Sequence, residues 1–387
     1  MDSKIKKLVV FSHKQIWKST NSKLGFATDG GFVYHMNAIS SLFEQTTLVL
    51  PLSRIQKQQG EIGFEGNNIT IIPIDDISGS GIKRKLKYPF WLLKNYGIIR
   101  REIKKADAVH VPIPSDLGTI GMVMANKMGK PLFVRYCGNW LQIITKTEKF
   151  WHGFMEKNAG GKNAFLTTGV ESEPPSMVNP NIKWIFSSSV TNSEILDLRK
   201  NVPSLDLINP KLVIVCRQEE EKGTRQVIEA VKLLKAEHPN LHLHIVGDGG
   251  ALSSFKQTVN DLSLENMVTF HGKVNHDDVL TIMQQCHLFC YPTRSSEGFP
   301  KVVLEAMASG LPVLGTPVSA IKFMLNTGGG IVLSDSKSET LAKAINIAIS
   351  DTETYLNMQE KALEKSQKFS LESWASEIKK HLDIYWN

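Results

Sequence analysis

Short apolar runs alternate with amphipathic stretches along the second half of the chain. Five of these runs have the length and content of buried strands, and the stretches between them have the length and spacing of ordinary helices. The predicted strands are Lys211–Cys216, Leu241–Val246, Met267–His271, His287–Tyr291 and Pro312–Gly315. Strands separated by helical segments predict a parallel, doubly wound α/β sheet.

The first half of the chain shows a less regular version of the same alternation. Strands are expected at Lys7–Ser12, Thr47–Leu50, Ile69–Ile74, Asp107–Pro112 and Lys130–Gly138, with AFLTTG and IKWIFSSS as the last strands of this sheet. At 387 residues the chain is long enough for two domains of roughly 150 to 200 residues each. Asn201, Pro203, Asn209 and Pro210 punctuate the chain and predict a hinge near 190–208.

A polar loop and a short helix follow the strand at His287–Tyr291. Pro300 suits the first helical turn because its φ is already helical, and Gly310, with Pro312 two residues on, predicts a left-handed stop. We therefore expect a helix over Pro300–Ser309. It starts at the carboxyl end of a parallel strand, where doubly wound sheets bind ligands, and its free amides at 301–303 form an anion site.

Two carboxylates, Glu297 and Glu305, frame this helix start. Beside phosphate-binding amides, carboxylates are poor phosphate ligands but good acceptors for hydroxyl groups. The pair therefore suggests a ligand that carries both phosphates and sugar hydroxyls, such as a sugar nucleotide. The plainer alternative is an N-terminal charge that favours the helix dipole, together with an ordinary surface glutamate.

The complete stretch resembles a known signature. Residues 297–305 read EGFPKVVLE, and AMASGLPVLGTP follows directly. This is similar to the motif E-G-F-x-x-x-x-x-E-A-M-A-x-G-x-P-V of the retaining glycosyltransferases of family 4, also called group 1, which have the GT-B fold. The resemblance implies an α/β protein of two Rossmann-like, doubly wound parallel-sheet domains facing each other across a cleft. In that reading residues 1–205 bind the acceptor, residues 206–368 bind the nucleotide sugar, and a helix in 369–387 crosses back to the first domain.

The resemblance also implies donor contacts. Glu305 would accept hydrogen bonds from the ribose hydroxyls and Glu297 from the donor sugar. A Gly-rich loop between the first strand and first helix of the family reaches the donor phosphates, and the residues after the third strand of the second domain line the base pocket. The further donor-binding residues that the resemblance implies are Gly30, Gly31, Gly272, Val274, Gly298, Phe299, Pro300, Lys301 and Val302.

Two cations follow the first strand of the second domain, in the run CRQEEEKGT. Arg217 and Lys222 could clamp a diphosphate, Arg through its planar fork and Lys as a point charge, whereas a solvated charged turn is the alternative. The family motif G-R-x-x-x-x-K-G resembles this run: Arg217, Lys222 and Gly223 match it, and Cys216 stands in place of the first glycine. With Glu297, Arg217 and Lys222 form the implied catalytic set, in which the cations neutralise charge on the leaving group.

Cys137 marks a departure from the family pattern. Members often carry a histidine near the donor sugar, in patterns like K-P-x-V-x-T-x-H-G, and KPLFVRYCG at 130–138 aligns with it. Cys137 then occupies the place of the histidine. A thiol does not reproduce the hydrogen bonding of an imidazole, so Arg135, Asn139 and His110 are considered as substitutes.

The segment VGDGG at 246–250 suggests a dinucleotide-binding site. The motif G-x-G-x-x-G needs glycine at position 252, which is Leu252. His271 and Gly272 at the end of the next strand supply no acid for a ribose. An NAD-dependent enzyme is therefore the least favoured class.

Charge is distributed unevenly. Residues 1–200 carry 27 Lys and Arg against 16 Asp and Glu, and the remainder carries 18 against 22. Within the first half, residues 83–94 interleave basic with aromatic and aliphatic side chains, which suits an anionic membrane surface. A solvated helix with an apolar inner face explains the segment equally well, and nucleic acid is not favoured because no known binding module is visible.

The composition agrees with a globular enzyme, at 42% hydrophobic and 21% charged residues. No apolar run is long enough for a membrane span, and the N-terminal apolar segment is too short for a signal peptide. A cytoplasmic protein is expected, with peripheral attachment to the inner face of the membrane as an option. The cysteines, at 137, 216, 286 and 290, form no C-x-x-C pair and predict no metal site.

The resemblance implies a metal-independent, retaining glycosyltransferase of the hexosyltransferase type without a cofactor. Its donor would be a nucleoside-diphosphate sugar, with the base open between UDP, GDP and ADP. Its acceptor would be a glycan or a lipid-linked precursor of a surface polysaccharide. Two alternatives share the fold: a sugar-nucleotide epimerase and a non-catalytic partner subunit that binds the sugar nucleotide.

Overall fold

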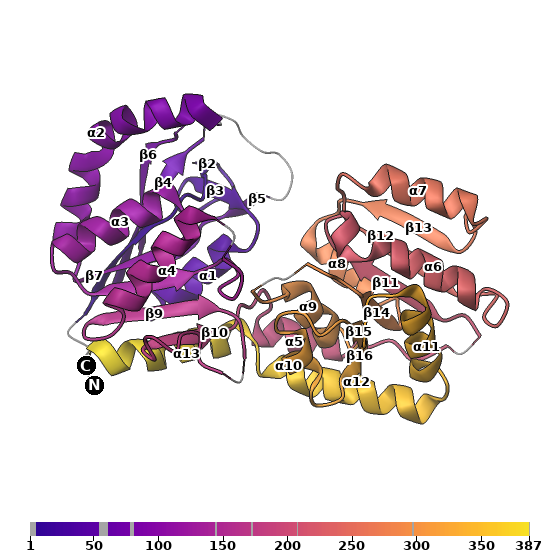
Figure 1. Ribbon diagram of the computed structural model, residues 1–387. Coiled ribbons are helices and arrows are strands. Elements are labelled where there is room, and N and C mark those ends of the chain that lie inside the picture. Colours follow the sequence, from indigo (N-terminus) through magenta and orange to yellow (C-terminus); the bar gives the residue numbers. More distant parts are fainter. Residues whose placement is uncertain are drawn as a thin grey trace. The chain divides into compact units, whose positions relative to one another are not determined.

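Figure 1 shows the computed structural model of the chain, which describes residues 5–53, 61–77, 81–143, 145–171, 173–206, 208–295 and 298–386, with the backbone alone for 81–85. The chain divides into two units, each with its own core. Unit 1 comprises Met1–Ile185 and Trp374–Asn387, and unit 2 comprises Phe186–Ser373.

Unit 1 is built on a seven-stranded parallel sheet in the spatial order β10-β9-β8-β7-β1-β4-β6. Its strands are β1 (Lys7–Phe11), β4 (Gln45–Leu52), β6 (Ile69–Asp75), β7 (Ala108–Ile113), β8 (Leu132–Tyr136), β9 (Asn163–Thr168) and β10 (Ile182–Ile185). Counted along the chain within this sheet, the order runs outward in both directions from β1. The direction of winding therefore reverses between β1 and β7, which is the topological switch point of the sheet.

Helices cover both faces of this sheet. Among the described residues of unit 1, the helices are α1 (Phe32–Ser40), α2 (Gly81–Lys105), α3 (Asp116–Lys127), α4 (Lys146–Asn158) and α13 (Leu371–Trp386). Trp91 of α2, Met122 of α3 and Met155 of α4 lie in one hydrophobic core with Val134 of β8. Arg135 is the next residue of β8 and faces the other way, with its guanidinium carbon 5.0 Å from the centre of the Trp374 ring of α13.

Helix α13 returns from the end of the chain to unit 1. Its indole rings make the contacts: Trp374 lies 4.7 Å from the ring of His35 on α1, and the Nε1 of Trp386 donates to the Lys162 carbonyl at 2.9 Å. The Trp386 ring also packs against Phe43. The last segment of the chain therefore completes the α1 face of unit 1.

A small antiparallel sheet was missed in the sequence. It consists of β2 (Trp17–Lys18), β3 (Phe26–Asp29) and β5 (Glu61–Gly63). No strand was predicted between Lys7–Ser12 and the Gly-rich loop, but Phe26–Asp29 form a strand, held by pairing with both neighbours. Polar strands this short depend on tertiary pairing, so they give no clear periodic signal.

Unit 2 contains a six-stranded parallel sheet in the order β13-β12-β11-β14-β15-β16. Its strands are β11 (Lys211–Val215), β12 (His242–Val246), β13 (Val268–Gly272), β14 (Leu288–Tyr291), β15 (Val313–Gly315) and β16 (Gly330–Val332). This is the 3-2-1-4-5-6 order of dinucleotide-binding and related sheets. Its switch point lies between β11 and β14, which pair directly at Leu212 and Val213.

The helical elements of unit 2 connect and cover these strands (Figure 1). They are α5 (Asn192–Arg199), the short 3-10 helix η1 (Glu220–Lys222), α6 (Thr224–Leu234), α7 (Leu252–Asp261), α8 (His276–Met283), α9 (Lys301–Ala308), α10 (Ile321–Leu325), α11 (Ser338–Ala348) and α12 (Thr352–Gln367). Side chains cap several of them, as where Asn275 accepts from the Asp278 amide at the start of α8.

The predicted class, with two doubly wound parallel sheets, is confirmed. The five strands predicted in unit 2 are present within one residue of their predicted ends, and β16 was not foreseen. The division between units falls after Ile185, earlier than the predicted 205. The reason is local: the Phe186 ring packs on Phe299 and Phe369, and the Leu371 amide donates to the Val190 carbonyl, so this segment belongs to unit 2.

Within the described part of the chain, no helix combines the length and apolar character that crossing a bilayer requires. Among the same residues, no three His, Cys, Asp or Glu side chains converge in a way that would hold a metal ion.

Candidate functional site

The switch point of unit 2 brings two of the predicted segments together. The segment after β11 contains Arg217 and η1, and the segment after β14 leads into α9. The two are joined by backbone hydrogen bonding, because the Arg294 amide donates to the Glu221 carbonyl at 2.8 Å. Since both strands end at the same edge of the sheet, this edge is the expected ligand crevice of the unit.

Lys222 lies at the junction of these segments. Its side chain is buried, with 7% of the residue exposed, and its ammonium nitrogen is 3.4 Å from the Ser295 hydroxyl. Gly223 makes this packing possible: its φ is +88°, and a Cβ there would lie 2.6 Å from the Pro292 carbonyl oxygen. Lys222 is thus directed toward the loop after β14, whereas Arg217 lies exposed at the end of β11.

Two of the three glutamates that separate these cations are engaged elsewhere. Glu220 pairs with Arg225 at 2.7 Å, which lowers the pKa of the carboxyl, and the Glu219 carboxylate accepts from the Gly250 amide at 3.3 Å. The acidic run therefore supports its neighbouring loops instead of opposing the cations.

The glycines of the VGDGG segment have a packing role. A Cβ on Gly247 would lie 1.9 Å from the Cys216 carbonyl oxygen, and one on Gly249 would lie 2.4 Å from that of Gln218. The buried Gln218 side chain ties the same loops together, donating to the Val246 carbonyl at 2.9 Å and accepting from Thr224 at 2.8 Å. Loop contact explains these glycines without a dinucleotide.

Helix α9 starts one residue later than predicted, with Pro300 as its N-cap instead of in its first turn. Proline offers no side-chain acceptor, so the first amides of α9, at Lys301 and Val302, receive no cap from it. The helix ends at Ala308, and Gly310 takes the predicted left-handed conformation with φ of +76°. Both ends thus follow the local signals in the sequence, within one residue.

Glu305 lies on α9 and is buried. Its Oε1 accepts a hydrogen bond from the Ser189 hydroxyl at 2.6 Å and lies 3.9 Å from Nδ1 of His276, the first residue of α8. Three segments distant in sequence therefore fix this carboxylate. Such a rigid acceptor suits a pair of hydroxyl groups on a ligand.

The other predicted residues of unit 2 divide by environment. The Phe299 side chain is a core residue, with its ring 6.1 Å from Phe186 and 5.5 Å from Phe369, so a direct side-chain contact with a donor is not supported. Gly272 ends β13 with φ of +66°, and Val274 lies half-buried just before α8. Gly298 is described and half-buried, whereas Glu297 lies outside the described residues.

In unit 1 the predicted Gly-rich turn opens a helix. Gly31 is the N-cap of α1, and Gly30 has φ of +66° with open space where a Cβ would point. The two residues before them, Thr28 and Asp29, belong to β3 and not to the loop. The paired glycines therefore keep their predicted position in front of a helix, where backbone amides are accessible.

The substitutes considered for the missing histidine do not all fit. His110 is fully buried, its ring stacks on Phe133 at 4.0 Å, and burial lowers its pKa to about 3. Arg135 is also buried, beneath the Trp374 ring. Both are core residues. Asn139 is half-buried, and Cys137 is exposed at the end of β8.

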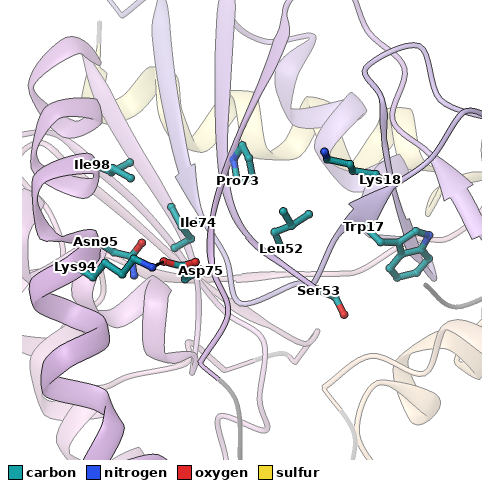
Figure 2. Close-up of a pocket in the computed structure, with 10 residues that line it drawn as sticks. All are labelled: Trp17, Lys18, Leu52, Ser53, Pro73, Ile74, Asp75, Lys94, Asn95 and Ile98. Atoms are coloured by element: carbon teal, nitrogen blue, oxygen red, sulfur yellow. Dashed lines mark ion pairs between the residues drawn. The ribbon is translucent and has the colours of Figure 1, made fainter. Parts of the chain in front are cut away.

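Unit 1 also contains a cavity of about 630 Å³ that sequence reasoning did not find. Figure 2 shows Asp75, Lys94 and Asn95 gathered on the side of α2, with Lys18 and Ser53 opposite them. The remaining lining residues are Trp17, Leu52, Pro73, Ile74 and Ile98. Lys94 and Asp75 form an ion pair of 2.6 Å. The cavity lies at the carboxyl ends of β4 and β6 and combines polar groups with an apolar floor, as small-molecule sites do.

Several residues that shape these sites carry no sequence signal. Gln218, Ser189 and His276 act through partners far away in the chain, and the side chains that line the cavity come from four separate elements. Only the packing of the folded unit brings them together. A pattern-based search would find such residues only by accident.

Comparison with known proteins assigns a class to this architecture. Residues 200–365 match the family model described as glycosyl transferases group 1. The crystal structure of HepE from Anabaena in complex with UDP and glucose has a TM-score of 0.69 at 18% identity, over 98% of this chain and 99% of that one. WaaG, a glycosyltransferase involved in lipopolysaccharide biosynthesis, has a TM-score of 0.61 at 15% identity over 98% and 99%.

Among curated proteins, an uncharacterised glycosyltransferase of Haemophilus influenzae is 27% identical over 193 residues, which are 49% of this chain and 53% of that protein. The chain likewise covers less than two thirds of the length of each of three further curated relatives. The fold is GT-B. The match to the glycosyl transferases group 1 model covers most of unit 2.

Proposed function

We propose that this chain is a retaining glycosyltransferase of family 4 that transfers a hexose from a nucleoside-diphosphate sugar. One observation carries the proposal: at the switch point of unit 2, buried Lys222 and the start of α9 approach the same loop after β14. A cation and the N-terminal end of a helix at one strand edge suit a diphosphate.

The chemistry follows from those groups. The bond between the anomeric carbon and the donor phosphate oxygen breaks, and a bond from the same carbon to the acceptor oxygen forms on the same face. The acceptor proton passes to the departing diphosphate, so no separate base is required. Lys222, Arg217 and the amides of Lys301 and Val302 stabilise the charge that develops on the leaving group. With these positive groups and the dipole of α9 in place, the reaction needs no metal.

The donor has a second recognition point in Glu305, which we assign to the ribose hydroxyls. Its fixed orientation through Ser189 makes it a preorganised acceptor. Glu297, from its position in the motif, is assigned to the donor sugar. Among the possible nucleotides we favour UDP, because the structural neighbour HepE was crystallised with UDP and glucose.

The acceptor is assigned to the cavity of unit 1. A carboxylate, an amide, a hydroxyl and two ammonium groups around an apolar floor suit a glycan or its phosphorylated carrier. WaaG, with the same fold, takes part in lipopolysaccharide biosynthesis. We therefore propose a glycan or lipid-linked precursor of a surface polysaccharide as the acceptor, used at the cytoplasmic face of the membrane.

A thermal-shift panel with UDP, GDP, ADP, CMP and NAD in the presence of a chelator tests the donor site. A ligand at 100 times its dissociation constant stabilises the folded protein by about 2.7 kcal/mol, so UDP should raise the melting temperature visibly. Stabilisation by NAD alone would overturn the assignment. Incubation with UDP-glucose then separates the enzyme classes, because release of a different sugar nucleotide without acceptor would indicate an epimerase.

A further inference from the structure

Helix α2 has a row of exposed apolar side chains, called the apolar line below, that does not take part in packing the helix on unit 1. Leu86, Phe90 and Leu93 are 69%, 76% and 76% exposed. Their spacing of four and three residues sets them on one line along the helix. Trp91 and Ile99 on the opposite side are buried in the core of unit 1. The exposed line therefore points directly away from the sheet.

Single exposed apolar residues are ordinary, but an aligned set on one helix indicates an interaction surface. A helix that covers a sheet requires one apolar face, and α2 has a second. Its sequence, GIKRKLKYPFWLLKNYGIIRREIKK, also contains nine Lys and Arg residues and a single acidic residue, Glu102. Glu102 is buried and is neutralised by Arg101 at 2.6 Å and Lys105 at 3.3 Å. The outer face thus presents no negative charge.

The placement of charge along α2 selects the partner. Lys87 and Lys94 lie exposed beside the apolar line, and Arg100, Arg101 and Lys104 continue the exposed face toward the end of the helix. An apolar line bordered by cations matches a surface with anionic groups at its boundary and hydrocarbon beneath, which is an anionic lipid bilayer. A purely apolar protein groove would offer Lys87, Arg100 and Lys104 no anionic partner.

We propose that the outer face of α2, defined by Leu86, Phe90, Leu93, Lys87 and Arg100, docks unit 1 on an anionic membrane. The three apolar side chains enter the boundary between head groups and acyl chains, and the cations meet lipid phosphates. Lys94, Asn95 and Ile98 of the same helix line the cavity of unit 1. Docking therefore brings the cavity to the head-group layer, where it meets the polar head of a lipid-anchored acceptor; this last step rests on the proposed function.

Co-sedimentation of the full chain with vesicles tests the surface. We compare phosphatidylcholine vesicles with vesicles that also contain phosphatidylglycerol, using the wild type and a Phe90→Ser/Leu93→Ser variant. The control is Leu196→Ser/Leu233→Ser, which replaces side chains that are 57% and 54% exposed in unit 2. We expect binding to the anionic vesicles only, a loss of more than tenfold in the α2 variant and no change in the control.

The role of charge is tested separately with Lys87→Gln. This substitution should reduce vesicle binding about fivefold, because that is the contribution of one lysine to the binding of an anionic surface. Raised salt should weaken wild-type binding because it screens the same attraction. The altered side chains are exposed, so unchanged thermal unfolding of each variant shows that folding is intact.

Two results would overturn the proposal: failure of the wild type to bind anionic vesicles, or equal binding by the Phe90→Ser/Leu93→Ser variant. A dimer that these substitutions abolish, without any lipid binding, would assign the face to a second copy of the chain instead. UDP-induced stabilisation of the same samples separates this test from that of the proposed function. Vesicle binding without stabilisation by UDP would support the docking surface and refute the donor site. Stabilisation by UDP without vesicle binding would support the donor site and refute the docking surface.

Discussion

Replacing Glu305 by glutamine should weaken donor binding while leaving the fold intact. The glutamine amide has the same shape, and its oxygen can still accept the hydrogen bond that the Ser189 hydroxyl gives at 2.6 Å. The free energy of unfolding should therefore change by less than about 1 kcal/mol. A hydrogen bond to a charged group contributes about 1.5 to 3 kcal/mol, so loss of the carboxylate should weaken UDP binding roughly tenfold to 150-fold.

Isothermal titration calorimetry with UDP and 2′-deoxy-UDP can assign the effect to the ribose. The wild type should bind UDP more tightly than the deoxy compound, and Glu305→Gln should bind both with nearly equal affinity. The matched control is Glu102→Gln, which alters a buried glutamate of unit 1 and should leave UDP affinity unchanged. If Glu305→Gln bound UDP within threefold of the wild type, the assignment of this carboxylate would be refuted.

Three further substitutions test other parts of the structure. Lys222→Met keeps the buried stem and removes the charge, so kcat/KM should fall at least tenfold, or about 1.4 kcal/mol, in a transfer assay. Gly223→Ala should cost about 1 to 3 kcal/mol more in urea unfolding than Gly272→Ala, because both need positive φ but only the former clashes with Pro292; equal costs would contradict this. The buried, neutral imidazole of His110, with its pKa lowered to about 3, should cost stability below pH 6.5, the unfolded value, since only the unfolded chain then gains a proton. Between pH 6.5 and about pH 5, the free energy of unfolding of His110→Phe should therefore fall by about 2 kcal/mol less than that of the wild type. An identical pH dependence of the two proteins would argue against the buried neutral ring.

Much of the fold could be predicted because its signals are local. Buried parallel strands are continuous apolar runs, and the helix at 301–308 is bounded by Pro300 and Gly310. The five strands predicted in unit 2 and this helix were therefore found within a residue. The small sheet around β3 could not be predicted, since its short polar strands depend on neighbours far away in sequence.

The candidate site divides in the same way. Lys222 and Glu305 could be proposed as site residues because they stand at fixed distances within a contiguous run of sequence. Gln218 and Ser189 were missed because each is defined by a partner across the fold. His110 was considered as a substitute for the missing histidine, whereas stacking on Phe133 and burial under neighbouring elements remove it from solvent. Burial is decided by packing, which sequence patterns reveal only in part.

The return of α13 to unit 1 has a consequence for biosynthesis. The strands of unit 1 are synthesised before unit 2, yet the α1 face is finished only by Trp374 and Trp386, which are synthesised after most of unit 2. Until then His35, Phe43 and Arg135 lack the indole rings that cover them. Unit 2, whose residues are continuous in the chain, can fold during synthesis before unit 1 is complete. Completion of the first unit therefore has to wait for a segment that is translated after the second unit.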